Sequence, residues 1–112
     1  MAITPAFQKS YGFYKNLYIN LRKVPKRDRY TWGERCEVLA LDLVQTFARA
    51  EFLPRGQKRL SLIHASETTD MLKIYLRLGL DLHIIDMKTL VARQGDLQEI
   101  GKMLGGWIKD VS

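Results

Sequence analysis

The sequence MLKIYLRLGLDLHII, residues 71–85, decides the fold of this chain. Its few polar residues fall three or four apart: Asp70 just before the stretch, then Lys73, Arg77 and Asp81. This spacing places them on one face of a helix and leaves the other sides apolar. A surface helix of a small domain usually has one apolar stripe, so a helix that is apolar on most sides must be covered from several directions. Within a helix expected over residues 58–86, the stretch therefore predicts either enclosure by three other helices or contact with a second subunit.

The charged residues of this helix allow two interpretations. Asp70 can pair with Lys73, and Arg77 can pair with Asp81, because residues three or four apart are neighbours on a helix surface. Alternatively, Lys73 and Arg77 face a binding partner. Both interpretations remain open at the level of the sequence.

The preceding residues predict two more helices. Thr4 followed by Pro5 is typical of a helix N-terminus, because a threonine side chain caps the first turn and proline suits its first position. The pair Val24-Pro25 ends this helix, since the residue before a proline is pushed out of the helical region. A second helix is expected from near Asp28 or Thr31 to about Phe52, where a Pro- and Gly-containing segment over residues 53–57 breaks it.

A fourth helix is expected after Asp86, which is a candidate N-cap, and it runs to the end of the sequence. Four helical segments of about 20 residues with short connections are typical of a helix bundle. No stretch alternates apolar and polar residues with the period of a strand. The sequence therefore predicts an all-α fold, an antiparallel up-down four-helix bundle, with residues 1–112 as a single domain.

Apolar residues at helical spacing identify the expected core. The candidates are Phe7, Tyr11, Tyr14, Tyr18 and Leu21 in the first helix, Trp32, Cys36, Leu39, Leu43, Phe47 and Ala50 in the second, and Leu90, Leu97, Ile100, Leu104, Trp107 and Ile108 in the fourth. The aromatic residues of the first helix could instead form a stacking platform for bases, but their spacing favours the core. Cys36 is the only cysteine, which excludes an intramolecular disulfide, and it is expected to be a buried thiol.

The balance of charge favours a polyanionic partner. The chain has 18 Lys and Arg residues against 12 Asp and Glu, a formal net charge of +6. Nucleic acid is the first candidate, followed by an anionic membrane surface and an acidic protein. No window is long and apolar enough to span a membrane, and the N-terminal residues lack the pattern of a signal peptide. We therefore expect a cytoplasmic protein without a membrane partner.

The basic residues concentrate at two connections between helices. The first group is Arg22, Lys23, Lys26, Arg27 and Arg29, and the second is Arg55, Lys58 and Arg59. In an up-down bundle these connections lie at opposite ends, about 30 Å apart. Together with Lys73 and Arg77, these residues are the candidate nucleic-acid-binding residues. Charge spread in this way suits an extended polyanion better than a small phosphate ligand.

The residues needed for enzymatic chemistry are not arranged in a recognisable pattern. His64 and His83 are nineteen residues apart on one expected helix, too far to share a metal ion. There is no glycine pattern of a phosphate-binding or dinucleotide-binding loop. We predict a protein that is not an enzyme and that has no catalytic residues, no metal and no cofactor.

The segment EIGKMLGGWIK, residues 99–109, contains three glycines in a helical pattern. A glycine inside a helix costs about 0.5–1 kcal/mol relative to alanine, so a compensating contact is expected. Gly101, Gly105 and Gly106 would allow a second helix to approach closely, with Trp107 as a large apolar anchor. This contact could lie inside the bundle or between subunits.

This glycine-rich segment, together with Pro25-Lys26 and the sequence Tyr75-Leu76-Arg77 within the apolar run over residues 72–82, resembles the accessory variability determinant (Avd) proteins of diversity-generating retroelements. The resemblance covers essentially the whole chain. The bundles encoded by intervening sequences of bacterial large-subunit ribosomal RNA genes are also similar, although they less often have the Gly-Gly-Trp ending.

The resemblance to Avd proteins implies a non-enzymatic partner of a reverse transcriptase. Such proteins assemble as a barrel-shaped homopentamer with a basic surface and bind nucleic acid, RNA or DNA, during mutagenic cDNA synthesis and retrohoming. By this resemblance, Lys73 and Arg77 are candidates for the basic surface. The alternative is an oligomeric four-helix scaffold, or an RNA-binding protein of the ribosomal intervening-sequence type, that is not tied to a reverse transcriptase.

Overall fold

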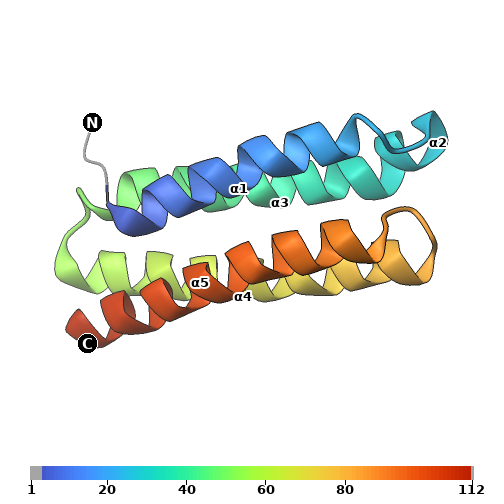
Figure 1. Cartoon of the computed structure of the whole chain (residues 1–112). Coiled ribbons are helices and arrows are strands. Elements are labelled where there is room, and N and C mark those ends of the chain that lie inside the picture. Colours follow the sequence, from blue (N-terminus) through green and yellow to red (C-terminus); the bar gives the residue numbers. More distant parts are fainter. Residues whose placement is uncertain (1–3, 112) are drawn as a thin grey trace.

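The structure of the chain, a computed structural model, is an antiparallel bundle of four long helices (Figure 1). It describes residues 4–111, and this part of the chain contains no strand. The elements are α1 (Pro5–Leu21), α2 (Lys26–Asp28), the π-helical turn η1 (Arg29–Gly33), α3 (Glu34–Ala50), α4 (Arg55–Asp81) and α5 (Met87–Asp110). The predicted all-α, four-helix fold is confirmed.

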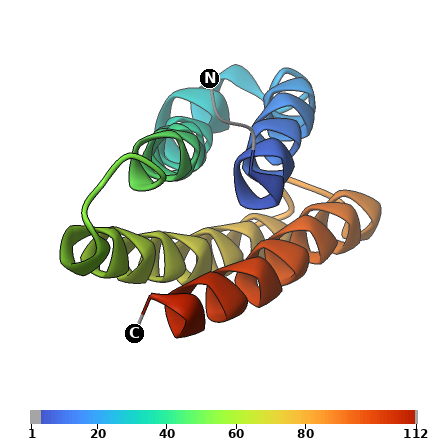
Figure 2. The ribbon, with the colours of Figure 1, turned by 90° about the vertical axis from the view of Figure 1, so that its left-hand side faces the viewer.

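The four long helices form two layers. Helices α1 and α3 make one layer and α4 and α5 make the other, as the view along the bundle shows (Figure 2). Each long helix packs against two neighbours, α1 on α3 and α5, and α4 on α3 and α5. The molecule measures 42 × 21 × 19 Å. The connection through α2 and η1 lies at one end with the α4–α5 loop, and the α3–α4 loop lies at the other end with the end of α5 (Figure 1).

Two of the long helices begin with the side-chain caps that the sequence predicts. The Thr4 hydroxyl accepts a hydrogen bond from the Phe7 backbone N–H at 3.1 Å, with Pro5 in the first helical position. The Asp86 carboxylate accepts a hydrogen bond from the Thr89 backbone N–H at 2.8 Å and caps α5. This hydrogen bond from Thr89 holds the pKa of Asp86 below its ordinary value. Both predicted helix starts are confirmed.

The second predicted helix differs from the observed one at its N-terminal end. Instead of one helix from residue 28 or 31, the chain forms the single turn α2 and the π-helical turn η1 before α3 begins at Glu34. A π turn contains more residues than an α turn and is rarely visible in a sequence pattern. Trp32, within η1, reaches α4 and donates its indole N–H to the Tyr75 carbonyl at 2.7 Å.

The core contains most of the predicted residues of α3 and α5. Cys36, Leu43, Phe47 and Ala50 are buried, and Leu39 is partly buried against them. Burial raises the pKa of the Cys36 thiol to about 12. The predicted α5 residues Leu90, Leu97, Ile100 and Leu104 are buried, while Trp107 and Ile108 are partly buried.

The core prediction for α1 is partly wrong. Phe7 and Leu21 are buried, but Tyr11 and Tyr18 are 53% and 46% exposed. Phe13 and Leu17 occupy the buried positions instead. Two apolar stripes run side by side along α1, and the stripe of tyrosines stays at the surface because a buried phenol hydroxyl needs a hydrogen-bond partner.

Helix α4 is not fully covered by the rest of the chain. Leu62, Leu72 and Leu76 are buried in the bundle. Its outward side exposes a stripe of large apolar residues, Leu60, Met71, Ile74, Leu78 and Leu82. The prediction that three helices of the same chain enclose α4 is therefore wrong for this side, and contact with a second subunit remains a prediction.

Candidate nucleic-acid interface

The connection between α1 and α3 forms the first basic corner, which consists of Arg22, Lys23, Lys26, Arg27 and Arg29. Leu21 and Val24 anchor it because both side chains are buried in the core. The Arg29 guanidinium donates hydrogen bonds to the carbonyls of Arg22 at 3.0 Å and Val24 at 3.1 Å. These are carbonyls that the end of α1 leaves without an intrahelical partner. Arg29 therefore stabilises the shape of the corner.

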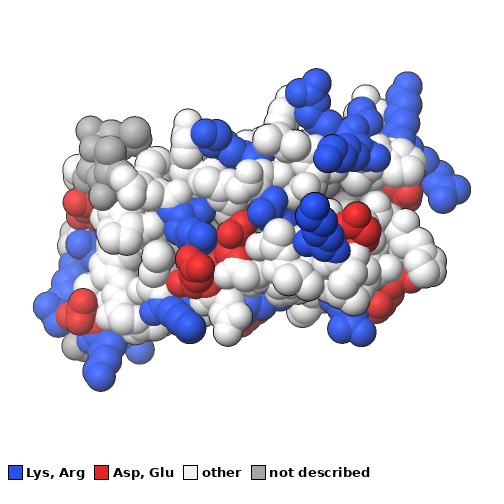
Figure 3. All heavy atoms as spheres, viewed as in Figure 1, with Lys and Arg blue, Asp and Glu red and all other residues white. Residues whose placement is uncertain are grey.

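The other four cations of the first basic corner are exposed to solvent. Within residues 22–29, Asp28 is the only carboxylate. The Arg27 side chain is 91% exposed, and its Nε lies 3.9 Å from the Asp28 carboxylate. Such a long, exposed contact neutralises little charge. Lys and Arg side chains crowd this end of the molecule in the space-filling view (Figure 3).

The second basic group lies at the opposite end of the bundle, as predicted. Arg55 and Arg59 are exposed and Lys58 is partly buried, all in the first turns of α4. The Arg55 guanidinium donates a hydrogen bond to the Asp110 carbonyl at 2.9 Å, which joins the start of α4 to the end of α5. Lys and Arg side chains also gather at this end in Figure 3.

Lys73 and Arg77 lie between the two ends, along α4. Arg77 Nε pairs with the Asp81 carboxylate at 3.2 Å, so one of the two predicted intrahelical pairs is confirmed. The pair of Asp70 with Lys73 is not formed among the described residues. An exposed pair such as Arg77–Asp81 contributes only about 0–1 kcal/mol, so it holds the Arg77 side chain weakly.

The middle of the α1–α5 face carries compensated charge. The Lys9 ammonium lies 3.0 Å from the Glu99 carboxylate and 3.3 Å from the Asp96 carboxylate. The hydrogen bond to Glu99 is the main reason that the pKa of Lys9 is raised above its ordinary value. Arg93 pairs with Asp96 at 3.1 Å. Lys and Arg side chains gather toward the ends of the bundle (Figure 3), and the ten candidate residues do not converge on one compact site.

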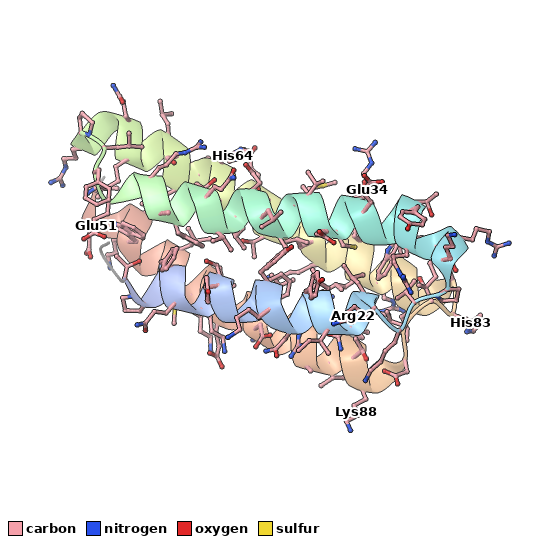
Figure 4. The ribbon with its side chains drawn as sticks, turned by 90° about the horizontal axis from the view of Figure 1, so that it is seen from above. Arg22, Glu34, Glu51, His64, His83 and Lys88 are labelled. Atoms are coloured by element: carbon pink, nitrogen blue, oxygen red, sulfur yellow. The ribbon has the colours of Figure 1, made fainter. Side chains whose placement is uncertain are left out.

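One basic cleft at the end of the first basic corner was not foreseen from the sequence. It has a volume of about 710 Å³ and lies between the end of α1, the α4–α5 loop and the start of α5. Its cations are Lys23, Lys88 and Arg93, with His83 and Asp86 on the loop. Figure 4 shows Arg22, His83 and Lys88 at this same end. These residues come from the connection after α1, the α4–α5 loop and the start of α5, and no local sequence pattern joins the first of these segments to the other two.

The glycines of α5 make no close contact with another helix of the chain, which was one of the two predictions for them. A Cβ added to Gly101, Gly105 or Gly106 would meet nothing within 4 Å. The interpretation of a tight helix contact inside the bundle is therefore wrong, and a contact between subunits remains a prediction. Trp107 does pack inside the chain, because its ring stacks on Phe47 with centroids 6.2 Å apart.

The two histidines lie apart on the surface. His64 Nε2 is 2.7 Å from the Asp42 carboxylate, whereas His83 is exposed in the α4–α5 loop with a positive φ of 60°. Among residues 4–111, no three His, Cys, Asp or Glu side chains are grouped so that they could hold a metal ion. In the same part of the chain, no helix combines the length and the apolar character needed to cross a membrane.

A comparison with protein families agrees with this arrangement of helices and charge. The family model described as bAvd-like matches residues 6–111. The chain belongs to the bAvd-like family. The match spans all four long helices of this bAvd-like protein, so it includes both basic ends and the glycine-rich segment. It identifies an accessory protein of the Avd type and confirms the resemblance noted in the sequence. No curated protein matches the chain.

Proposed function

We propose that this bAvd-like protein is a non-enzymatic accessory protein that binds nucleic acid and partners a retroelement reverse transcriptase in cDNA synthesis and mutagenic retrohoming. Membership of the family supports the partnership with a reverse transcriptase. The observation that supports nucleic-acid binding is the first basic corner, where four exposed cations are opposed by the single carboxylate Asp28.

The shape of the charged surface suits a nucleic-acid backbone. Like charges that lie close together repel one another, and a row of phosphates removes that repulsion while releasing counterions. The two basic ends are separated along a molecule 42 Å long, which an extended polyanion can span and a small anion cannot. Contacts from Lys and Arg to phosphates position a strand without reading its bases. We therefore expect weak sequence preference.

We also propose that the protein acts as a homo-oligomer, a homopentameric ring according to its resemblance to Avd proteins. The support for this in the structure is the outward stripe of α4, where Met71, Ile74 and Leu78 are exposed at helical spacing. Contiguous exposed apolar residues are typical of interaction surfaces. A ring has head-to-tail interfaces, so the stripe on α4 would contact a different surface of the next subunit.

The first test measures the affinity of the protein for a structured RNA and for duplex DNA across a series of salt concentrations. On duplex DNA, log K should fall with log salt with a slope of about −0.9 for each phosphate neutralised. Replacing Lys26→Gln and Arg27→Gln should weaken binding and reduce the slope by about 1.8, the contribution of two phosphates. Gln45→Glu with Gln98→Glu is the matched control, because it makes the same change in net charge at exposed positions of α3 and α5 that belong to neither basic end.

The control separates a local interface from a general effect of charge. If both double variants weaken binding equally, the first basic corner has no special role. If the wild-type protein binds neither nucleic acid at low salt, the nucleic-acid part of the proposal is wrong and the oligomeric scaffold replaces it. The partnership is tested separately by co-purification with a retroelement reverse transcriptase from the same genome. Failure to co-purify in the presence and absence of RNA would contradict it.

A further inference from the structure

The outer face of α1 carries a stripe of alternating aromatic and basic residues, which we call the tyrosine stripe: Tyr11, Lys15, Tyr18 and Arg22. The intervals of four, three and four residues place all of them on one side of the helix. The sequence pattern suggested that the tyrosines belong to the core, yet both rings are about half exposed. Figure 4 looks down on the layer of α1 and α3 and shows Arg22 at the end of α1.

Each exposed ring of the stripe has a cation beside it. The Lys15 ammonium lies 5.6 Å from the centroid of Tyr11, and the Arg22 guanidinium lies 5.9 Å from the centroid of Tyr18. Both distances are within the range of a cation–π contact. Positive charge is therefore placed next to flat apolar surfaces that remain open to solvent.

The two rings are also supported by aromatic neighbours. The ring of Tyr11 lies 5.9 Å from Phe7, which is buried, and the ring of Tyr18 lies 6.4 Å from Tyr14. Tyr14 is itself held by a hydrogen bond from its hydroxyl to the Glu37 carboxylate at 3.3 Å. Burial and the nearby Glu37 raise the pKa of Tyr14. Rings that are held in place lose less conformational freedom when a base stacks on them.

The spacing along α1 fits several nucleotides. Tyr11 and Tyr18 are seven residues apart, which is about 10.5 Å along the helix axis. This is close to three stacked bases at about 3.4 Å each. The stripe ends at Arg22, which is also the first residue of the first basic corner, so a bound strand would continue onto Lys23 and Lys26. The Glu37 carboxylate, which lies beside the aromatic residues of α1, is engaged by the Tyr14 hydroxyl.

We propose that the tyrosine stripe binds single-stranded nucleic acid, with bases stacked on Tyr11 and Tyr18 and phosphates contacted by Lys15 and Arg22. This inference rests on the proposed function and specifies the form of nucleic acid that one surface takes. Stacking on aromatic rings is available to unpaired bases, because a duplex keeps its bases stacked in its interior. A second copy of the chain is a poorer occupant, since the two cations of the stripe favour an anionic partner.

The experiment compares the binding of an oligouridylate of about 12 nucleotides with that of a DNA duplex of about the same length, by fluorescence anisotropy. The double variant Tyr11→Ala with Tyr18→Ala should bind the single strand about 30-fold more weakly, the loss expected for two stacked bases. Its affinity for the duplex should change less than about threefold. The variant Tyr11→Phe with Tyr18→Phe keeps both rings and should bind like the wild type.

Ile19→Ala is the matched control, because it removes an exposed apolar side chain from α1 outside the stripe. It should leave both affinities unchanged. Unchanged single-strand binding by the alanine variant would overturn the inference while leaving the proposed function intact. Equal losses on both ligands, or a change in subunit number measured by light scattering, would also overturn it. If the wild type binds no nucleic acid at all, the inference and the nucleic-acid part of the proposed function fail together.

Discussion

Gly79 is the residue at which the absence of a side chain is most clearly required. It is buried in α4 opposite Trp32, whose indole also donates to the Tyr75 carbonyl one turn earlier. A Cβ at position 79 would lie 2.8 Å from Cε2 of the indole and closer still to Cζ2. Trp32 is itself buried and cannot simply move away. The contact between η1 and α4 therefore depends on this glycine.

Replacing Gly79→Ala should lower the free energy of unfolding by about 1–3 kcal/mol, the usual cost of overpacking a core. The helix preference of alanine would act in the opposite direction, so the clash must exceed that gain. Chemical denaturation followed by tryptophan fluorescence measures the change. Gly12→Ala is the control, because no atom lies within 4 Å of the added Cβ there and a stabilisation of about 0.5–1 kcal/mol is expected. A neutral Gly79→Ala variant would contradict the role given to Trp32.

At the level of single elements, the buried faces of α3 and α5 follow from the sequence, whereas those of α1 and α4 follow only in part. The α3 face from Cys36 to Ala50 has one clear apolar stripe, so its buried side follows from spacing alone. In α1, the stripe with Phe13 and Leu17 competes with the stripe with Tyr11 and Tyr18. Spacing cannot choose between two stripes, and the phenol hydroxyls decide the outcome through their need for hydrogen-bond partners.

Some features of the candidate site can be predicted from neighbouring residues in the sequence, and others depend on how distant helices pack. Because the basic corner lies within residues 22–29, its exposure follows from the break at Pro25. The cation–π contacts of the tyrosine stripe depend on which side of α1 faces the core. The spacing of apolar residues along α1 does not determine that side. The cleft with Lys23 and Lys88 depends on the packing of α1 beside α5, which no local pattern predicts. The π turn around Trp32 likewise depends on its contact with α4.

The open space beside the glycines of α5 leads to a prediction about the stability of this helix. Nothing in the chain lies near a Cβ added at Gly105, so Gly105→Ala should raise the free energy of unfolding by about 0.5–1 kcal/mol through the helix preference of alanine. Thermal and chemical unfolding would measure this change, and light scattering would give the number of subunits. Lower stability accompanied by fewer subunits would show instead that a helix of another subunit packs against Gly105, which is the contact between subunits that remains a prediction for these glycines.

At the level of the whole molecule, charge and apolar surface are separated. Lys and Arg side chains gather toward the two ends (Figure 3). The tyrosine stripe lies on α1 and the apolar stripe lies on α4. These two helices belong to opposite layers of the bundle (Figure 2). A subunit can therefore contact another through α4 and still present α1 and the first basic corner to nucleic acid. This separation makes self-association and nucleic-acid binding compatible, and it allows each to be disrupted alone.

Replacing Ile74→Ser together with Leu78→Ser should dissociate the proposed homo-oligomer without unfolding the bundle, because both side chains are exposed, Ile74 to 61%. Burying one such side chain contributes about 1.5–3 kcal/mol, so losing two should weaken the contact between subunits by roughly a hundredfold or more. Size-exclusion chromatography with light scattering measures the number of subunits, and circular dichroism checks that the helices remain. Val91→Ser is the matched control, since Val91 is 63% exposed on α5. If the double variant keeps all its subunits, or if the wild type is already a monomer, then α4 is not the surface that joins them.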